Sequence, residues 1–176
     1  MKDGLFKTIL YTILGIGIMT ALMTLTSITT PIEGVYIQLA YGYLALFAGV
    51  AGAIPAAIVG FTGHVLFDLI YTDHLWLSWA LSTGALGFVF GFAIRRKSLR
   101  QGVFSQHDMV RFNVVQAVVN IAIFGLIAPT LDVLFYQQST TIVFTQGWIA
   151  SIVNLLTVAV FGTITLKLYA NYKLKQ

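Results

Sequence analysis

The sequence predicts an all-α integral membrane protein with six transmembrane helices, both termini in the cytoplasm, and a single domain over residues 1–176. Of its residues, 58% are hydrophobic and only 9% are charged, whereas a soluble domain carries about 25% charged residues. The mean hydropathy is +0.88. These apolar residues are too many for one buried core, so lipid must solvate part of the surface. The protein is therefore expected in the cell membrane as a multi-pass protein.

Each predicted span is a stretch of predominantly apolar residues, of which a bilayer crossing needs about 20. The six stretches are Phe6–Leu25, Tyr36–Val50, Ala56–Tyr71, Leu75–Ile94, Arg111–Leu134 and Trp148–Tyr169. The first follows a positive flank, as a signal peptide would, but it is long and lacks a small-residue cleavage site. We therefore interpret it as a retained span. The second is short for a full crossing.

The connections between these spans contain turn-forming or polar residues. They are a Pro- and Gly-containing loop at Ser27–Gly34, a tight turn at Ala51–Pro55, a short loop at Thr72–His74, and polar segments at Arg95–Asp108 and Phe135–Gly147. Pro129 lies near the end of the fifth span, where a helix break or kink is tolerated.

The distribution of charge gives the orientation. With the N-terminus inside, every basic residue falls at the cytoplasmic side, as the positive-inside rule requires. These residues are Lys2, Lys7, Arg95, Arg96, Lys97, Arg100, Arg111, Lys167, Lys173 and Lys175. The carboxylates of Glu33, Asp68, Asp73 and Asp132 fall at or near the outer side. The net charge of +4 does not indicate nucleic acid, because no basic stripe is interleaved with exposed aromatics.

The polar residues of the spans, sorted by depth, gather in the outer half. His64 and Asp68 are four residues apart and so share one helix face. Asn113 and Gln116 lie near the cytoplasm instead. An outward-facing pocket for a small polar aromatic solute is predicted from this gathering. The predicted substrate-binding residues are Glu33, Gln38, His64, Asp68, Trp79, Thr83, Asn120, Asp132, Gln146 and Asn154.

Structural roles are the alternatives for several of these side chains. His64 and Asp68 could form a hydrogen-bonded pair that joins adjacent helices, and single amides such as Asn113 often hold helices together. Trp76 and Trp148 suit an aromatic belt at the membrane interface. Glu33 is solvated unless its loop folds over the pocket.

Enzymatic and ion-pumping functions lack a sequence signature. His64 with Asp68 offers a base and an orienting group, but no G-x-S-x-G nucleophile accompanies them. Adding His74 produces no standard metal-ligand spacing, and cysteine is absent. The chain has no P-loop of its own and no line of charges across the bilayer. The remaining interpretation is a membrane protein that binds a solute without a metal or cofactor and depends on another subunit for energy.

The first span contains small residues suited to a partner helix. Gly15, Gly17 and Ala21 include a Gly-x-x-x-Ala pair, and small residues at this spacing let helices approach closely. These three residues are the predicted partner-docking positions. Packing within the protein is the alternative.

Segments spread over nearly the whole chain carry a family resemblance. They are IQLAYGYLALFAG from Ile37, GFTGHVLFDLI from Gly60, WLSW from Trp76, RFNVVQAVVN from Arg111, APTLDVLFY from Ala128 and VFTQGWIASIVN from Val143. The chain resembles the substrate-binding S component of an energy-coupling factor (ECF) transporter, specifically the group associated with hydroxymethylpyrimidine, the thiamine precursor.

The resemblance implies a six-helix S component that binds a small heteroaromatic vitamin or precursor from outside. It also implies docking on a transmembrane T component that works with two cytoplasmic ABC-type ATPases. An Ala-x-x-x-Ala motif serves docking in that family, and the matching positions here are Gly17 and Ala21. The runner-up interpretations are a stand-alone small channel or secondary transporter, and then a membrane enzyme using His64 and Asp68.

Overall fold

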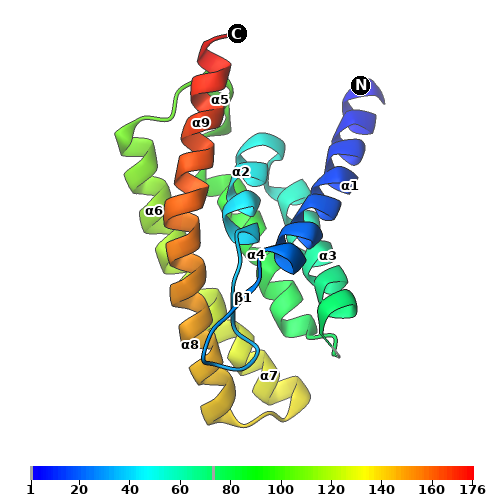
Figure 1. The fold of residues 1–176 in the computed structure, drawn as a ribbon. Helices are drawn as coiled ribbons and strands as arrows, with labels where there is room; N and C mark the ends of the chain where they lie inside the picture. Colours follow the sequence, from blue (N-terminus) through cyan, green and yellow to red (C-terminus); the bar gives the residue numbers. More distant parts are fainter. Residues whose placement is uncertain (1, 73) are drawn as a thin grey trace.

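The computed structural model describes residues 2–72 and 74–176, which form a bundle of helices with one short β-hairpin (Figure 1). Asp73, predicted at the outer side, lies outside the described residues. Within them, four helical segments are long and apolar enough to cross a membrane: Leu5–Leu25, Ala53–Tyr71, Gln106–Tyr136 and Thr140–Leu174. The regions predicted as the second and fourth spans form shorter apolar helices, at Ala40–Ala51 and Leu77–Ala93. This architecture agrees with the predicted all-α membrane class.

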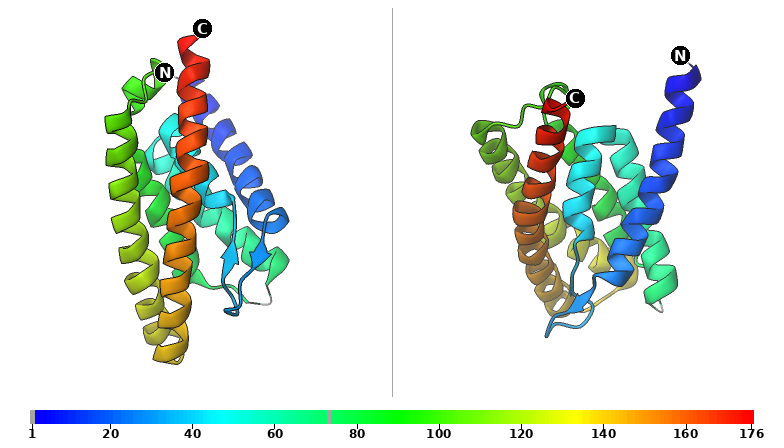
Figure 2. Two further views of the ribbon diagram at one scale, coloured as in Figure 1. Left: turned by 60° about the vertical axis from the view of Figure 1, so that its left-hand side comes forward. Right: turned by 45° about the horizontal axis from the view of Figure 1, so that its top comes forward.

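The outer surface of the bundle is suited to lipid rather than to water. Large apolar side chains point away from the protein, among them Phe6, Phe92 and Leu134, each about two-thirds exposed. Both chain ends lie at the same end of the bundle, at the top of Figure 1. The β-hairpin lies toward the opposite end, as the further views in Figure 2 also show.

The closest helix pair is α3 (Ala53–Tyr71) and α4 (Leu77–Ala93), and α1 (Lys2–Leu25) packs against α3. Glycines on α4 let the two backbones touch. A Cβ atom at Gly87 would lie 2.5 Å from the carbonyl oxygen of Ala56, and one at Gly91 would lie 2.3 Å from Cα of Ala53. Small residues are the usual means of close helix approach in lipid.

We expect Gly87→Leu to destabilise the bundle strongly, because the new side chain must push α3 and α4 apart. Overpacking a tight contact costs about 1–3 kcal/mol. Thermal unfolding of the detergent-solubilised protein should show a lower midpoint. Gly17→Leu is the matched control, since a Cβ there meets nothing within 4 Å. Equal midpoints for the two variants would contradict the assigned packing.

The helix α2 (Ala40–Ala51) lies in the middle of the bundle and has a sharply defined end. The chain reverses at Gly52, whose φ of +103° favours glycine. Arg96 donates from Nη2 to the carbonyl oxygens of Val50 (3.1 Å) and Ala51 (2.8 Å), which the helix end leaves unpaired. The turn predicted at Ala51–Pro55 is therefore shorter than expected, because Ala53 already begins α3 and Pro55 is tolerated in its first turn.

The second predicted span also begins later than expected. Tyr36–Ile37 forms β2, which pairs antiparallel with β1 (Ile28–Thr29), so the predicted helical start at Tyr36 is wrong. The helix α4 begins at Leu77 rather than Leu75. The connection Arg95–Asp108 contains the short helix α5 (Arg96–Arg100) and the start of the next helix, where Ser105 and Asp108 form a capping box.

The last two spans are long, nearly continuous helices that lie side by side (Figure 2). The fifth consists of α6 (Gln106–Asn120), the π-helical η1 (Ile121–Ile127) and α7 (Ala128–Tyr136). The sixth consists of α8 (Thr140–Thr157), the π-helical η2 (Val158–Gly162) and α9 (Thr163–Leu174). Helical structure continues through Pro129, directly after the π-helical turns.

The polar loop predicted at Phe135–Gly147 is wrong over most of its length. Only residues 137–139 separate α7 from α8, and the chain turns at Gln137, which has a φ of +52°. A polar side chain of this segment can be accommodated within the helix, as Thr145 shows by donating its hydroxyl proton to the carbonyl oxygen of Thr141 at 2.8 Å. The sixth span therefore starts at Thr140, well before Trp148.

Candidate functional site

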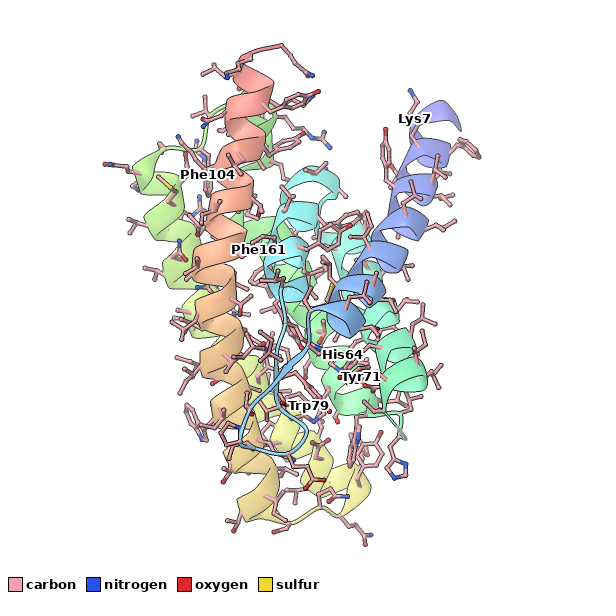
Figure 3. All side chains as sticks on the ribbon, in the orientation of Figure 1. Lys7, His64, Tyr71, Trp79, Phe104 and Phe161 are labelled. Atoms are coloured by element: carbon pink, nitrogen blue, oxygen red, sulfur yellow. The ribbon has the colours of Figure 1, made fainter. Side chains whose placement is uncertain are left out.

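A cavity of about 480 Å³ lies at the end of the bundle opposite the termini, between the hairpin and helices α2, α3, α4, α7 and α8. Figure 3 shows His64, Tyr71 and Trp79 at this end, far from Lys7 and Phe104. Its volume falls in the range of roughly 300–1,000 Å³ that is typical of small-molecule sites. Eight predicted residues line it: Glu33, Gln38, His64, Asp68, Trp79, Asp132, Gln146 and Asn154.

The hairpin segment is fastened over this cavity. Gln146 on α8 donates from Nε2 to the carbonyl oxygen of Glu33 at 2.9 Å. Gln38, which is buried, donates from Nε2 to the carbonyl oxygen of Met23 (3.1 Å) and to Ser27 Oγ (2.8 Å). The loop that carries Glu33 thus folds over the pocket. From the sequence, Glu33 is expected to be solvated unless its loop does so, and Glu33 lines the cavity.

Asp68 and His64 stand on one face of α3, as their spacing predicted. Asp68 accepts a hydrogen bond at Oδ2 from the backbone N–H of Trp76 (2.9 Å), so it holds the segment between α3 and α4. Its Oδ1 lies 3.6 Å from Nε2 of His64. The other ring nitrogen of His64, Nδ1, lies 2.7 Å from Oγ1 of Thr83. Both side chains are buried against the protein and still border the cavity.

Asp132 joins α7 to α4 on the other side of the cavity. Its Oδ1 accepts from the hydroxyl of Ser78, and its Oδ2 accepts from the indole N–H of Trp79 at 2.7 Å. This pair of hydrogen bonds fixes the orientation of the Trp79 ring, which borders the cavity and packs on Phe124.

Two of the predicted substrate-binding residues lie outside the cavity wall. Thr83 stands behind His64, where its hydroxyl also donates to the carbonyl oxygen of Trp79 at 3.0 Å. Asn120 is fully buried between helices and donates to the backbone and side-chain oxygens of Gln116. Depth alone placed both residues at the level of the pocket, but neither of them is part of its wall.

Aromatic residues make up a part of the wall that the polar pattern did not identify. They are Tyr36, Tyr41, Phe67, Tyr71 and Trp76. Phe67 and Tyr71 follow His64 at helical spacings of three and seven, so the face that carries His64 and Asp68 could have revealed them. Tyr41 comes from α2 and interacts with the side chains of Thr83 and Asn154. Burial, with smaller effects of Tyr71, Glu33 and Asp68, raises the pKa of Tyr36, which keeps its phenol a hydrogen-bond donor.

A metal centre is not formed by the side chains that the structure describes. Among these residues, no group of three or more His, Cys, Asp or Glu side chains could hold an ion.

The three predicted docking residues on α1 do not share one environment. Gly15 is buried, and a Cβ there would lie 2.6 Å from the ring of Phe47 and 2.9 Å from Val59. It therefore contributes to packing inside the protein, which was the alternative to docking. Gly17 and Ala21 are exposed on the outer face of α1, and a Cβ at Gly17 meets nothing within 4 Å.

A helical membrane bundle with one aromatic and polar cavity beneath a fastened loop is the architecture of a membrane solute-binding protein. Comparison with known families is more specific. The sequence model described as "ECF-type riboflavin transporter, S component" matches residues 5–171. The chain belongs to this ECF S-component family, and it is thus a transport subunit, the substrate-binding membrane subunit of an ECF importer. Membership implies association with a T component and ATPases in an ECF complex.

Relatives cover the chain almost from end to end. A UPF0397 protein of Lactococcus lactis is 41% identical over 99% of this chain and 96% of its own length. Similar proteins of Enterococcus faecalis (38% identical, 100% and 97% covered) and Lactobacillus acidophilus (40% identical, 93% and 88% covered) also match. No solved structure matches the chain significantly.

Proposed function

We propose that this subunit captures a small heteroaromatic vitamin or vitamin precursor from outside the cell and delivers it inward when docked on its T component. The cavity carries this proposal, because it combines aromatic walls with acceptor and amide side chains in one space. Pockets of this kind bind planar polar ligands by stacking and a few oriented hydrogen bonds.

The orientation in the membrane is part of the proposal. Six spans with both termini in the cytoplasm would place the cavity at the outer side, because it lies at the end opposite the termini. The basic segment Arg95–Arg100 and the C-terminal lysines would then meet the cytoplasm, in agreement with the positive-inside rule. A T component and two ABC-type ATPases would supply the energy, since the chain has no P-loop.

The substrate is to be identified with a panel of compounds. The panel contains hydroxymethylpyrimidine and thiamine, which follow from the sequence resemblance, a pyridoxine-like compound, and riboflavin, which the matched family carries in its name. We expect the purified chain to bind one of them, or to retain it through purification. Absence of binding across the whole panel would contradict the proposal. Uptake by proteoliposomes that contain this chain alone would indicate a stand-alone transporter instead.

Ligand binding should change the tryptophan fluorescence of the protein, because Trp76 and Trp79 both line the cavity. We expect Trp79→Phe to remove most of the change, since its ring is oriented by Asp132 and can stack on the ligand. Trp148→Phe is the control, as that ring packs over Gly125 outside the cavity. A titration that keeps its full amplitude in Trp79→Phe would show that the ligand does not stack on this ring.

A further inference from the structure

The charged side chains that line the cavity have one sign among the residues that the structure describes. Glu33, Asp68 and Asp132 contribute carboxylates, and neither lysine nor arginine is present in the wall. Both oxygens of Asp132 accept hydrogen bonds, as suits an ionised carboxylate, which has no proton to donate. A cavity of this composition disfavours an anionic ligand.

The pair formed by His64 and Asp68 leaves two acceptors facing each other. The Thr83 hydroxyl donates its single proton to the carbonyl oxygen of Trp79 at 3.0 Å. We therefore assign the proton of the 2.7 Å contact between Thr83 Oγ1 and His64 to Nδ1 of the imidazole. A neutral imidazole with its proton on Nδ1 presents Nε2 as an acceptor. This atom lies 3.6 Å from Oδ1 of Asp68, which is longer than a hydrogen bond.

A hydrogen-bond donor on the ligand can lie between Nε2 of His64 and Oδ1 of Asp68. An amino group has two N–H bonds, so one nitrogen can donate to Nε2 of His64 and to Oδ1 of Asp68 at once. Both side chains are more than nine-tenths buried and border the cavity, where a ligand can reach them. Aromatic rings around the cavity, including Tyr36, Tyr71 and Trp76, add attraction for a positive charge through their π faces.

We propose that the ligand is a heteroaromatic base that carries an amino group or a positive charge, and that it donates N–H hydrogen bonds to His64 Nε2 and Asp68 Oδ1. This inference rests on the proposed function and narrows its substrate class. Neutral ligands that present only acceptors at this position, and ligands with a carboxylate or phosphate, are disfavoured by the same groups.

Two matched series of compounds test the inference on the unmodified protein by isothermal titration calorimetry. The first compares 4-amino-5-hydroxymethyl-2-methylpyrimidine with its 4-oxo counterpart. The second compares pyridoxamine, pyridoxine and 4-pyridoxic acid, which share a ring and differ in bearing an ammonium, a hydroxyl or a carboxylate group. We expect the amino member of the preferred series to bind at least about tenfold more tightly than its partners, as is typical of a hydrogen bond to a charged group.

The variant Asp68→Asn adds a test of the position itself. It removes the charge and supplies an amide N–H₂ where the ligand donor would lie, so the preference for the amino compound should fall about tenfold. Asp108→Asn is the matched control, because that carboxylate caps α6 outside the cavity. The preference should be unchanged in the control.

The possible outcomes separate this inference from the proposed function. Equal or tighter binding of the oxo or carboxylate compound, or tight binding of riboflavin alone, would overturn the inference and leave the proposed function standing. Such a result would indicate that Nε2 of His64 carries a proton and already donates to Asp68. Absence of binding by every compound, riboflavin and thiamine included, would contradict both. The series on the unmodified protein decides the question even if Asp68→Asn does not fold.

Discussion

Asp68→Ala and Asn154→Ala are each expected to weaken substrate binding by at least about tenfold, whereas Asn113→Ala should leave it within about twofold. Asp68 and Asn154 border the cavity from α3 and α8, so each would lose a direct contact with the ligand. Asn113 instead donates to the carbonyl oxygen of Met109 and to Thr163 Oγ1, both at 2.9 Å, away from the cavity.

Asp68→Ala has a second expected effect, because the carboxylate also accepts from the backbone N–H of Trp76. Its loss frees the segment between α3 and α4, which carries part of the cavity wall. Calorimetric titration with whichever panel compound binds the unmodified protein measures all three variants, and thermal unfolding shows whether each remains folded. Similar losses of affinity in the three variants would show that the cavity is not the binding site.

Much of the site could be predicted from depth and helix periodicity. An apolar span makes a polar residue conspicuous, and the rise of about 1.5 Å per residue converts its position into depth. His64 and Asp68, four residues apart, therefore had to share a face. That reasoning identified eight residues that line the cavity. It could not distinguish a residue in the wall from one directly behind it, such as Thr83.

The parts that could not be predicted depend on contacts between distant segments. The side chain of Tyr41 reaches the cavity only because α2 lies at the centre of the bundle, and nothing local in the sequence sets that position. The start of α8 was missed because threonine suits a loop and can equally satisfy its hydroxyl within a helix, as Thr145 does. The hairpin before α2 is held by Gln146, whose partner Glu33 lies 113 residues away in the sequence.

The roles of the two glycines on α1 also depend on contacts with distant segments, and they lead to a prediction about docking. Residues two apart on a helix point about 200° from each other, so Gly15 and Gly17 cannot serve one surface. The sequence shows that both are small, but only packing shows that Gly15 meets Phe47 while Gly17 faces outward. Gly17 and Ala21, four residues apart, do share a face.

Gly17→Leu is expected to abolish copurification of the T component while leaving substrate binding by the isolated chain unchanged. A leucine fits this position in the monomer, because a Cβ there meets nothing within 4 Å. It would nevertheless hold away any helix that packs closely on the small surface formed with Ala21. Coexpression of the tagged chain with a T component and its ATPases, followed by affinity purification, measures the complex directly.

Gly15→Leu is the informative comparison for that experiment. Its side chain would collide with Phe47 and Val59, so we expect loss of folded protein and not a selective loss of the partner. A Gly17→Leu protein that binds substrate normally and still copurifies with the T component would remove the outer face of α1 from the docking surface. Loss of the complex with binding intact would instead separate the two functions of the subunit, because the cavity and the face around Gly17 share no residue.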